Sequence, residues 1–412
     1  MTGDHIAELD AQRSGRKRVL FIAEAVTLAH AARPVALAAS LDPDLYEVHV
    51  AWDPRFAHVF DTLPGHTSSL RSISPQRFAA ALAKGSPVYD TVTLRDYVRD
   101  DLALLDRIKP DAVIGDFRLS LAISAPLAGV PYLTITNAYW SPYLKQQLPL
   151  PDLPINRVLG VPVSRALFRM AIPFAFALHA QPLNRVRREH GLPSLGHDLR
   201  TIYTWANHTL YADLPALYPD FSRPPNHHFL GAIAWEPTVS LPPWWAELPS
   251  DRPTIYVNLG SSGASRLLDI VLLALADLPV FVIAARAGGQ SPTVLPANAR
   301  LADFLPGSVA AAAAGLAVCN GGSPATQQAL RAGIPMLALP SNMDQYLNAA
   351  RVVAAGAARV LRAEQADSSA VRTAVSALLQ DDGYAAAARR LADDCAPQVA
   401  LGRFSMLLAD VA

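Results

Sequence analysis

The strongest constraint on the fold is a repeated alternation of short apolar runs with stretches of helical spacing. In the first half, apolar runs typical of strands buried on both faces cover residues 19–25, 46–52, 111–116 and 131–136. The same pattern returns in the second half at residues 254–259, 280–285, 315–320 and 335–340. Helices are expected between these runs, near residues 34–41, 95–108, 119–128, 265–276, 324–332 and from about 344. Strands joined through helices form parallel sheets, so the sequence predicts an α/β chain with two Rossmann-like units.

A proline-rich stretch separates the two series. Residues 214–252 hold many prolines and few periodic positions, which is typical of an inter-domain linker, and the boundary is expected near 235–252. We therefore expect an N-terminal domain over residues 1–240, with 1–16 a flexible tail, and a C-terminal domain over residues 253–412. The last helix is a candidate to pack back on the N-terminal domain. Two such domains facing each other predict a binding cleft between them.

Composition narrows the classes of protein that need to be considered. Hydrophobic residues make up 51% and charged residues 17%, so the chain can bury large cores. The 35 basic residues equal the 35 acidic ones and form no basic block, so neither nucleic acid nor an anionic membrane surface is indicated as a partner. The two cysteines, Cys319 and Cys395, favour a reducing compartment, and a cytoplasmic location is expected.

One segment raises the question of a membrane. Residues 164–180 are apolar, but they contain Arg165, Arg169 and Pro173 inside a span that is short for a bilayer. No transmembrane segment is therefore expected, and the N-terminus resembles no signal peptide. Peripheral membrane contact, or a role for this stretch beside a lipophilic ligand, stays open. The oligomeric state is not predicted.

A strand-to-helix turn in the second half has the features of an anion site. An apolar strand runs into Asn320, Gly321 and Gly322 and then directly into a helix. Ser323 is expected to cap that helix, and Pro324 suits its first position. Free N–H groups at a helix start behind two glycines bind anions, so phosphate or diphosphate is expected there. The alternative is an ordinary tight turn with no ligand.

From residue 315 to residue 350 the chain resembles the GT-B glycosyltransferases of family 1, which use nucleotide sugars and include plant secondary-product and bacterial macrolide glycosyltransferases. The residues that match this family's blocks in order are Asn320-Gly321-Gly322, Ala329-Leu330, Gly333-Ile334-Pro335, Asp344-Gln345 and Asn348-Ala349. Upstream, residues 259–262 resemble the family's Gly-Ser turn, and residues 303–306 resemble its block with a base-stacking aromatic residue. The resemblance implies the GT-B fold, in which two Rossmann-like domains face each other across a cleft.

The resemblance also implies a donor site. In it Phe304 would stack on the nucleobase, and Asp344 and Gln345 would hydrogen-bond sugar hydroxyls. Asn320 stands where the family usually has a histidine, and Gln328 replaces a glutamate, so the choice between uridine and thymidine diphosphate stays open. The complete set of expected donor-binding residues is Gly260, Ser261, Ser262, Phe304, Leu305, Asn320, Gly321, Gly322, Ser323, Ala325, Thr326, Gln328, Asp344 and Gln345.

The catalytic candidates lie in the first half. With Leu37-Ala38 and Leu41 as anchors, His30 falls on the family's histidine, with Arg33 in place of a proline, and Asp116 falls on the aspartate that pairs with it. A hydroxyl is a weak nucleophile, so sugar transfer needs a base, and an imidazole held in one tautomer by a carboxylate provides one. The alternatives are a surface or capping histidine and a turn-forming aspartate. The acceptor is expected to contact aromatic residues that could equally be core, namely Tyr139, Trp140, Tyr143 and Phe174.

Together these features predict an inverting, metal-independent hexosyltransferase that moves a sugar from a nucleotide diphosphate sugar to a hydroxyl of a small lipophilic or aromatic natural product. No cofactor and no metal ligand set is expected, and the pair His227-His228 is expected to be solvated in the linker. Two alternatives stay open. One is an auxiliary binding protein in which Asn320 marks lost donor chemistry, and the other is a nucleotide-sugar epimerase or hydrolase on the same architecture.

Overall fold

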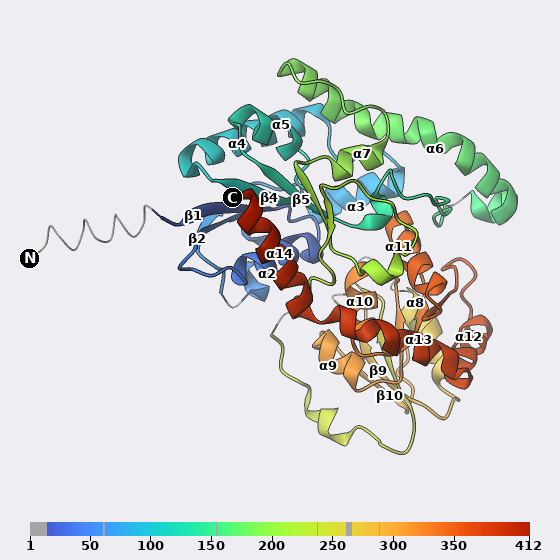
Figure 1. Cartoon of the computed structure of the whole chain (residues 1–412). Helices are drawn as coiled ribbons and strands as arrows, with labels where there is room; N and C mark the ends of the chain where they lie inside the picture. Colours follow the sequence, from blue (N-terminus) through green and yellow to red (C-terminus); the bar gives the residue numbers. More distant parts are fainter. Residues whose placement is uncertain (1–14, 61, 154, 237, 261–265, 288) are drawn as a thin grey trace, which may run out of the picture.

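The chain forms two parallel-sheet α/β domains. The computed structural model describes residues 15–412 except 61, 154, 237, 261–265 and 288. The N-terminal domain occupies the upper part of Figure 1 and the C-terminal domain the lower part. Most of the tail predicted over residues 1–16, and the predicted donor residues Ser261 and Ser262, lie outside the described residues.

The N-terminal sheet is parallel throughout, with the strand order β3-β2-β1-β4-β5-β6-β7. Its strands are β1 (Lys17–Ala23), β2 (Tyr46–Trp52), β3 (His66–Ser69), β4 (Ala112–Asp116), β5 (Tyr132–Thr136), β6 (His208–Tyr211) and β7 (His227–Phe229). Its helices are α2 (Leu28–Ala39), α3 (Pro75–Lys84), α4 (Thr91–Ile108), α5 (Leu121–Ala128), α6 (Asn156–Glu189) and α7 (Leu199–Thr204).

Alternating side chains of β1 explain why this sheet is buried on both faces. Val19 and Phe21 pack in one hydrophobic cluster with α2, whereas Leu20 and Ile22 pack in another with α4 and α5. Successive side chains of a strand point to opposite faces, so an unbroken apolar run is what a sheet covered by two helix layers requires. The continuous apolar runs in the sequence therefore identified β1, β2, β4 and β5 correctly, whereas β3, β6 and β7 were not predicted.

The C-terminal sheet is parallel as well, with the order β10-β9-β8-β11-β12-β13. One face packs against α8 and α12 and the other mainly against α9, α10 and α13. Its strands are β8 (Thr254–Asn258), β9 (Phe281–Ala285), β10 (Ala299–Ala302), β11 (Leu316–Cys319), β12 (Met336–Ala338) and β13 (Ala358–Val360). The helices of this half are α8 (Arg266–Leu275), α9 (Gly307–Ala312), α10 (Ser323–Arg331), α11 (Met343–Ala354), α12 (Ser368–Gln380), α13 (Asp382–Ala392) and α14 (Pro397–Val411).

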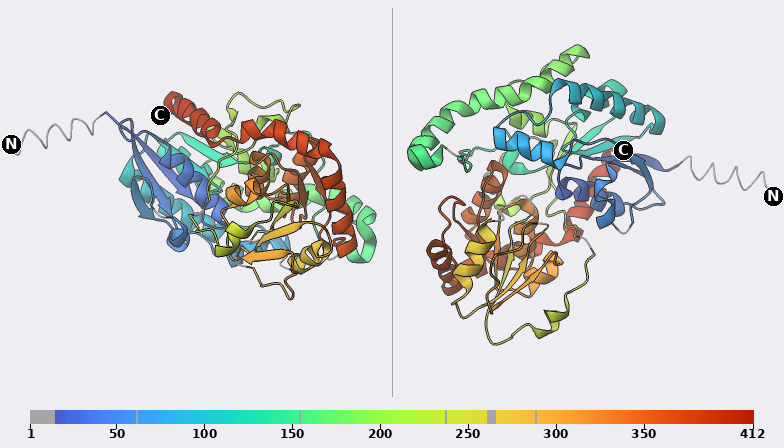
Figure 2. Two further views of the ribbon diagram at one scale, coloured as in Figure 1. Left: turned by 90° about the horizontal axis from the view of Figure 1, so that it is seen from below. Right: turned by 180° about the vertical axis from the view of Figure 1, so that it is seen from behind.

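The two domains are joined by apolar contacts as well as by the chain. The final helix α14 crosses back to the N-terminal sheet (Figures 1 and 2), where Phe404 contacts Phe21 with 6.0 Å between ring centroids. Tyr139 and Tyr211 of the N-terminal domain belong to the same hydrophobic cluster as Tyr256 of β8. This shared cluster fixes the domains against each other at the ends of both sheets that carry the predicted site.

Two predictions from the sequence are wrong. Residues 227–229 form the edge strand β7 instead of a linker, and His227 is buried, with its Nδ1 2.6 Å from the Tyr211 hydroxyl. A strand of three residues is too short to give a periodic signal, which is why the sequence did not reveal it. The N-cap of α10 is Gly322 instead of Ser323, because Asn320 Oδ1 accepts the Gly322 N–H at 2.9 Å and folds the preceding turn.

Candidate active site

His30 and Asp116 form a hydrogen-bonded pair. His30 lies in the first turn of α2, whose N-cap Thr27 accepts the His30 backbone N–H, and Asp116 ends β4. The His30 Nδ1 atom is 2.7 Å from Asp116 Oδ1, and Asp116 is completely buried whereas His30 keeps some exposure. A contact this short between nitrogen and a carboxylate oxygen needs a proton on Nδ1, so the lone pair of the neutral ring lies on Nε2. This is the tautomer that a general base requires.

Arg33 completes this arrangement and was not predicted as a site residue. One helical turn after His30, its guanidinium donates to both carboxylate oxygens of Asp116, from Nε at 2.7 Å and from Nη2 at 2.8 Å. A buried carboxylate needs such partners, and a bidentate arginine also fixes the plane of the carboxyl group. The available signal was an arginine three residues after the histidine, on the same face of the helix.

Two further polar residues extend the network across the sheet. Arg33 Nη1 donates to Asn137 Oδ1 at 3.0 Å, and Asn137 Nδ2 donates to Asp213 Oδ1 at 3.1 Å. Burial raises the pKa of Asp213 to about 6, although the Ala138 N–H donates to its other oxygen at 2.6 Å. Asp116, Asn137 and Asp213 lie at or just after the ends of β4, β5 and β6, so the network follows the carboxyl edge of the sheet, where open α/β folds bind ligands.

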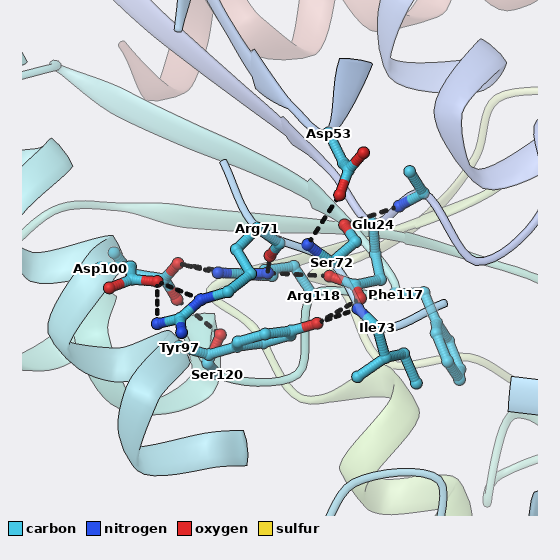
Figure 3. A network of polar contacts seen from close by, with 12 residues as sticks. Glu24, Asp53, Arg71, Ser72, Ile73, Tyr97, Asp100, Phe117, Arg118 and Ser120 are labelled. Carbon is cyan, nitrogen blue, oxygen red and sulfur yellow. Dashed lines mark hydrogen bonds and ion pairs between the residues drawn. The ribbon is translucent and has the colours of Figure 1, made fainter. Parts of the chain in front are cut away.

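A second polar network supports the loop after β4 (Figure 3). The Arg118 side chain is completely buried and donates to Glu24 and Asp101, both at 2.9 Å, while its guanidinium lies 3.5 Å from the Tyr97 ring centroid. Burial raises the pKa of Glu24 even though Arg118 opposes the shift. The neighbouring Phe117 has φ of 57°, an unusual backbone conformation for a residue with a side chain. The network therefore holds a strained residue directly beside the His30–Asp116 pair.

Phe117 lines the site together with other aromatic side chains. Its ring stacks on His30 with centroids 4.9 Å apart and an interplanar angle of 19°. The Phe117 ring also contacts Tyr203, and Tyr203 meets the edge of Trp140. A chain of ring contacts through Phe117 and Tyr203 thus connects His30 to Trp140, one of the four predicted acceptor residues.

The other predicted acceptor residues lie elsewhere. Tyr139 is buried in the cluster shared by the two domains, and Tyr143 is half exposed with its ring against His227. Phe174 is exposed on α6. Phe117 and Tyr203 were missed because single aromatic residues in an apolar sequence give no signal of their position in the fold.

In the C-terminal domain two predicted donor loops meet. Gly260 follows β8 with φ of 67°, and a Cβ atom added to it would lie 2.6 Å from Asn320 Nδ2. Gly321 has φ of 79°, and a Cβ there would lie 3.2 Å from the Gln345 carbonyl oxygen. Both positions thus need glycine for backbone conformation and for space. The Asn320 side chain is directed between the two loops, where a histidine is usual in the resembling family.

Helix α10 starts where these loops meet. Its N-cap Gly322 has no side chain that could cap the first turn, so no N-cap side chain competes with an anion for the backbone N–H groups at the start of α10. Thr326 is buried and donates to the Gly322 carbonyl oxygen, and Gln328 lies against Gly307 at the start of α9. Ser323 accepts from Gln327, and Ala325 is partly buried beside the shared cluster. Thr326 and Ser323 therefore shape the turn through their own contacts.

The remaining predicted donor-binding residues differ in exposure and in whether their side chains are already hydrogen-bonded within the protein. Phe304 is 52% exposed, as a platform for a flat ring would be, and the following Leu305 is buried. The Asp344 carboxylate accepts from Trp140 Nε1 at 2.8 Å. Gln345 is buried, and its side-chain oxygen accepts the Ser341 N–H at 2.9 Å.

Contacts between the domains bring the two half-sites together. The Trp140–Asp344 bond links the aromatic surroundings of His30 to the start of α11. Gln327 of α10 donates to the Ala212 carbonyl oxygen at 2.7 Å, one residue before Asp213 of the polar network. Among the residues that the structure describes, no group of three or more His, Cys, Asp or Glu side chains could hold a metal ion.

Comparisons with known proteins agree with this geometry. Residues 269–400 match the family described as erythromycin biosynthesis protein CIII-like, C-terminal domain. The chain is 50% identical over 385 residues to the PGL/p-HBAD biosynthesis glycosyltransferase of Mycobacterium tuberculosis (strain ATCC 25177 / H37Ra), over 93% of this chain and 90% of the relative. It is 51% identical over 378 residues to the PGL/p-HBAD biosynthesis rhamnosyltransferase of Mycobacterium bovis (strain BCG / Pasteur 1173P2), over 92% of this chain and 84% of the relative. The solved spinosyn rhamnosyltransferase SpnG, complexed with thymidine diphosphate, has a TM-score of 0.65 at 22% identity, over 94% of this chain and all of that one.

Fold and site together define a two-domain enzyme that transfers a sugar from a nucleotide sugar to an acceptor. A base held by a carboxylate lies at the edge of one sheet, and a glycine-rich helix start lies in the other domain. The identity of at least half over more than nine tenths of the chain covers both half-sites. The chain belongs to the GT-B glycosyltransferases of family 1, as the motifs predicted.

Proposed function

We propose that this glycosyltransferase moves a sugar, rhamnose being the first to test, from a thymidine diphosphate donor to a hydroxyl of a lipophilic or aromatic acceptor, with inversion at the anomeric carbon. The observation that carries the proposal is the 2.7 Å contact between His30 and Asp116. The rhamnosyltransferase relative supports the sugar, the thymidine diphosphate complex of SpnG supports the nucleotide, and the aromatic surroundings of His30 support the acceptor class. The relatives' PGL/p-HBAD pathway is the first context in which to seek that acceptor.

In the proposed reaction His30 Nε2 takes the proton of the acceptor hydroxyl as that oxygen attacks the anomeric carbon. Asp116 stabilises the resulting imidazolium, and Arg33 holds the carboxylate in its plane. The bond to the nucleotide diphosphate breaks on the opposite side of the carbon, and a single in-line displacement inverts it. Backbone N–H groups at the start of α10, with Asn320 Nδ2, stabilise the departing diphosphate without a metal in this proposal.

The cytoplasm is the proposed location. Cys319 and Cys395 are both buried and unpaired, which suits a reducing compartment. Burial also raises the pKa of both thiols, to about 11 for Cys319 and to about 12 for Cys395, so neither is a reactive thiolate at neutral pH.

The first measurement is a thermal shift against thymidine, uridine and guanosine diphosphates and their sugars. A ligand at about 100 times its dissociation constant stabilises the folded state by about 2.7 kcal/mol. We expect the largest shift with a thymidine diphosphate ligand. A shift with none of these ligands would contradict the donor site and favour the auxiliary binding protein.

The decisive variant is His30→Ala, with His190→Ala as the matched control on an exposed histidine. Removal of a general base lowers turnover by about 10² to 10⁴-fold, whereas donor binding in the other domain stays unchanged. Full turnover in His30→Ala would refute the proposed base. Release of free sugar, or a changed sugar nucleotide, without acceptor would identify a hydrolase or an epimerase instead.

A further inference from the structure

Helix α6 carries a stripe of large apolar side chains that face solvent. They are 42% to 79% exposed, and their positions are separated by four, three, four and four residues, which places them on one face of the helix. Contiguous exposed apolar surface of this kind is uncommon on a protein that contacts only water. The members of this stripe are Val163, Leu167, Met170, Phe174 and Leu178.

The stripe lies on an element that is fixed at both ends. At its start, Asn156 Nδ2 donates to the Pro151 carbonyl oxygen at 2.9 Å and to Glu364 of the C-terminal domain at 3.1 Å. Toward its end, Phe176 and Leu183 are buried in a cluster that includes residues of α4. Between these anchors the helix runs along the outer edge of the N-terminal domain (Figures 1 and 2). The exposed stripe is therefore a surface of the folded domain.

Charge around the stripe is strongly one-sided. Residues 153–188 contain six arginines and no aspartate or glutamate, in a chain whose basic and acidic totals are equal. The equal totals had argued against an anionic membrane, but they conceal this local segregation. Arg165 and Arg169 are exposed. Arg165 lies two residues from Val163 and from Leu167, and Arg169 lies two residues after Leu167 and one before Met170, so both project from the side of the helix away from the stripe.

We propose that α6 docks this enzyme on an anionic phospholipid bilayer, with the apolar stripe in the boundary between headgroups and acyl chains. An apolar face opposed by arginines is the pattern of helices that lie in this interface. The long stems of Arg165 and Arg169 can lie along apolar surface while their guanidinium groups reach lipid phosphates. A second copy of the chain fits less well, because a contact through the stripe would leave the exposed Arg165 and Arg169 without an acidic partner from residues 153–188 of the other copy.

The helix lies on the bilayer and does not cross it. The helical segment Val158–Glu189 is long enough to span a bilayer, and an 18-residue window within it has a mean hydropathy of 1.4. Crossing would pull Phe176 and Leu183 out of their cluster and would place Arg165 and Arg169 at membrane depth. The cluster that holds Phe176 and Leu183 of α6 also contacts Phe117, the residue that stacks on His30. The buried face of the docked helix is therefore directed toward the acceptor side of the active site. The docking itself requires neither donor nor acceptor and does not depend on the proposed reaction.

Vesicle co-sedimentation of the full chain tests the proposal. The vesicles are phosphatidylcholine alone and phosphatidylcholine mixed with phosphatidylglycerol, each at low and high salt. Leu167→Glu combined with Met170→Glu is expected to weaken binding at least about tenfold. The matched control combines Leu273→Glu and Met406→Glu, which makes the same changes at side chains on α8 and α14 that are more exposed than Leu167 and Met170, and it is expected to bind like the wild type.

A second pair of substitutions tests the charge. Arg165→Gln with Arg169→Gln is expected to lower binding to the anionic vesicles by about fivefold for each arginine and to leave the weak binding to neutral vesicles unchanged. High salt is expected to reduce the wild type's binding to anionic vesicles toward the level of the Arg165→Gln, Arg169→Gln variant, because salt screens the attraction between arginine and lipid phosphate. Thermal unfolding of all variants separates a loss of docking from misfolding. The unfolding midpoints are expected to match that of the wild type, because the changed side chains are exposed.

Several results would overturn the proposal. They are no sedimentation with anionic vesicles at low salt, an equal loss in the Leu273→Glu and Met406→Glu control, or membrane association that resists high salt and alkaline extraction. Sedimentation velocity without vesicles provides a further result that would contradict the proposal. A wild-type dimer that Leu167→Glu with Met170→Glu converts to a monomer, together with no vesicle binding, would assign the stripe to a second copy of the chain.

Discussion

Replacement of Asp116 by asparagine tests how the catalytic histidine is held. In the wild type, Asp116 Oδ1 accepts from His30 Nδ1 and Arg33 Nη2, and Oδ2 accepts from Arg33 Nε, all within 2.8 Å. An asparagine has one oxygen and one NH₂ group, so the position of either Oδ1 or Oδ2 must be taken by a group that donates. Since a guanidinium can only donate, an NH₂ toward Arg33 Nε leaves two donors facing each other. An NH₂ toward His30 makes Nδ1 the acceptor and transfers the ring proton to Nε2, which removes the base.

The expected magnitude follows from these contacts. In enzymes with a Ser–His–Asp triad, loss of the carboxylate that fixes the tautomer lowers kcat about 10⁴-fold. We expect about 10³ to 10⁴-fold here, equivalent to about 4 to 5.5 kcal/mol in the activation barrier. The lost charge-assisted hydrogen bond also costs about 1.5 to 3 kcal/mol of folding stability, because the site is buried.

The assay is steady-state turnover with a saturating sugar nucleotide, combined with thermal unfolding and titration of thymidine diphosphate. Nucleotide affinity is expected to be unchanged, because the donor loops lie in the other domain. Asp111→Asn is the matched control, since it makes the same change at an exposed residue just before β4. A variant with lowered stability but kcat within about tenfold of the wild type would show that Asp116 is purely structural and would refute the reasoning.

Three further predictions concern other parts of the molecule. Phe304→Ala is expected to weaken nucleotide binding about tenfold or more, because base stacking on an aromatic ring contributes about 1 to 3 kcal/mol, and calorimetric titration measures this. Gly260→Ala is expected to lower both stability and nucleotide affinity, since φ is 67° and the new Cβ would meet Asn320; an unchanged thermal midpoint would contradict the loop geometry. Burial lowers the pKa of His227 to about 4, below the ordinary value of 6.5, so its contribution to folding stability is present above pH 6.5 and falls by about 2 kcal/mol as the pH drops from 7 to 5. His227→Asn should reduce this acid sensitivity in urea unfolding between pH 5 and 7, and an identical pH dependence would contradict it.

The donor loops show how far motifs carry a prediction. Asn320, Gly321 and Gly322 were predicted from residue order alone, because glycine is one of few residues that tolerate positive φ and close backbone approach. The helix start was displaced by one residue, since the Asn320 side chain folds the turn through a contact that the residue order does not specify. Likewise, the contact between Gly260 and Asn320 joins loops sixty residues apart, and only the sheet order β8-β11 brings them together.

The sequence by itself determined the class of fold, most strands of both sheets, the His30–Asp116 pairing and the glycine-rich helix start. These depend on local periodicity and on ordered motifs, which a chain carries in its residue order. Only the tertiary structure decided that Arg33, Asn137 and Asp213 join the pair, that His227 is buried and that α6 presents an apolar stripe to solvent. The physical reason is that burial and long-range polar contacts depend on which elements become neighbours, and residue spacing along the chain does not contain that information.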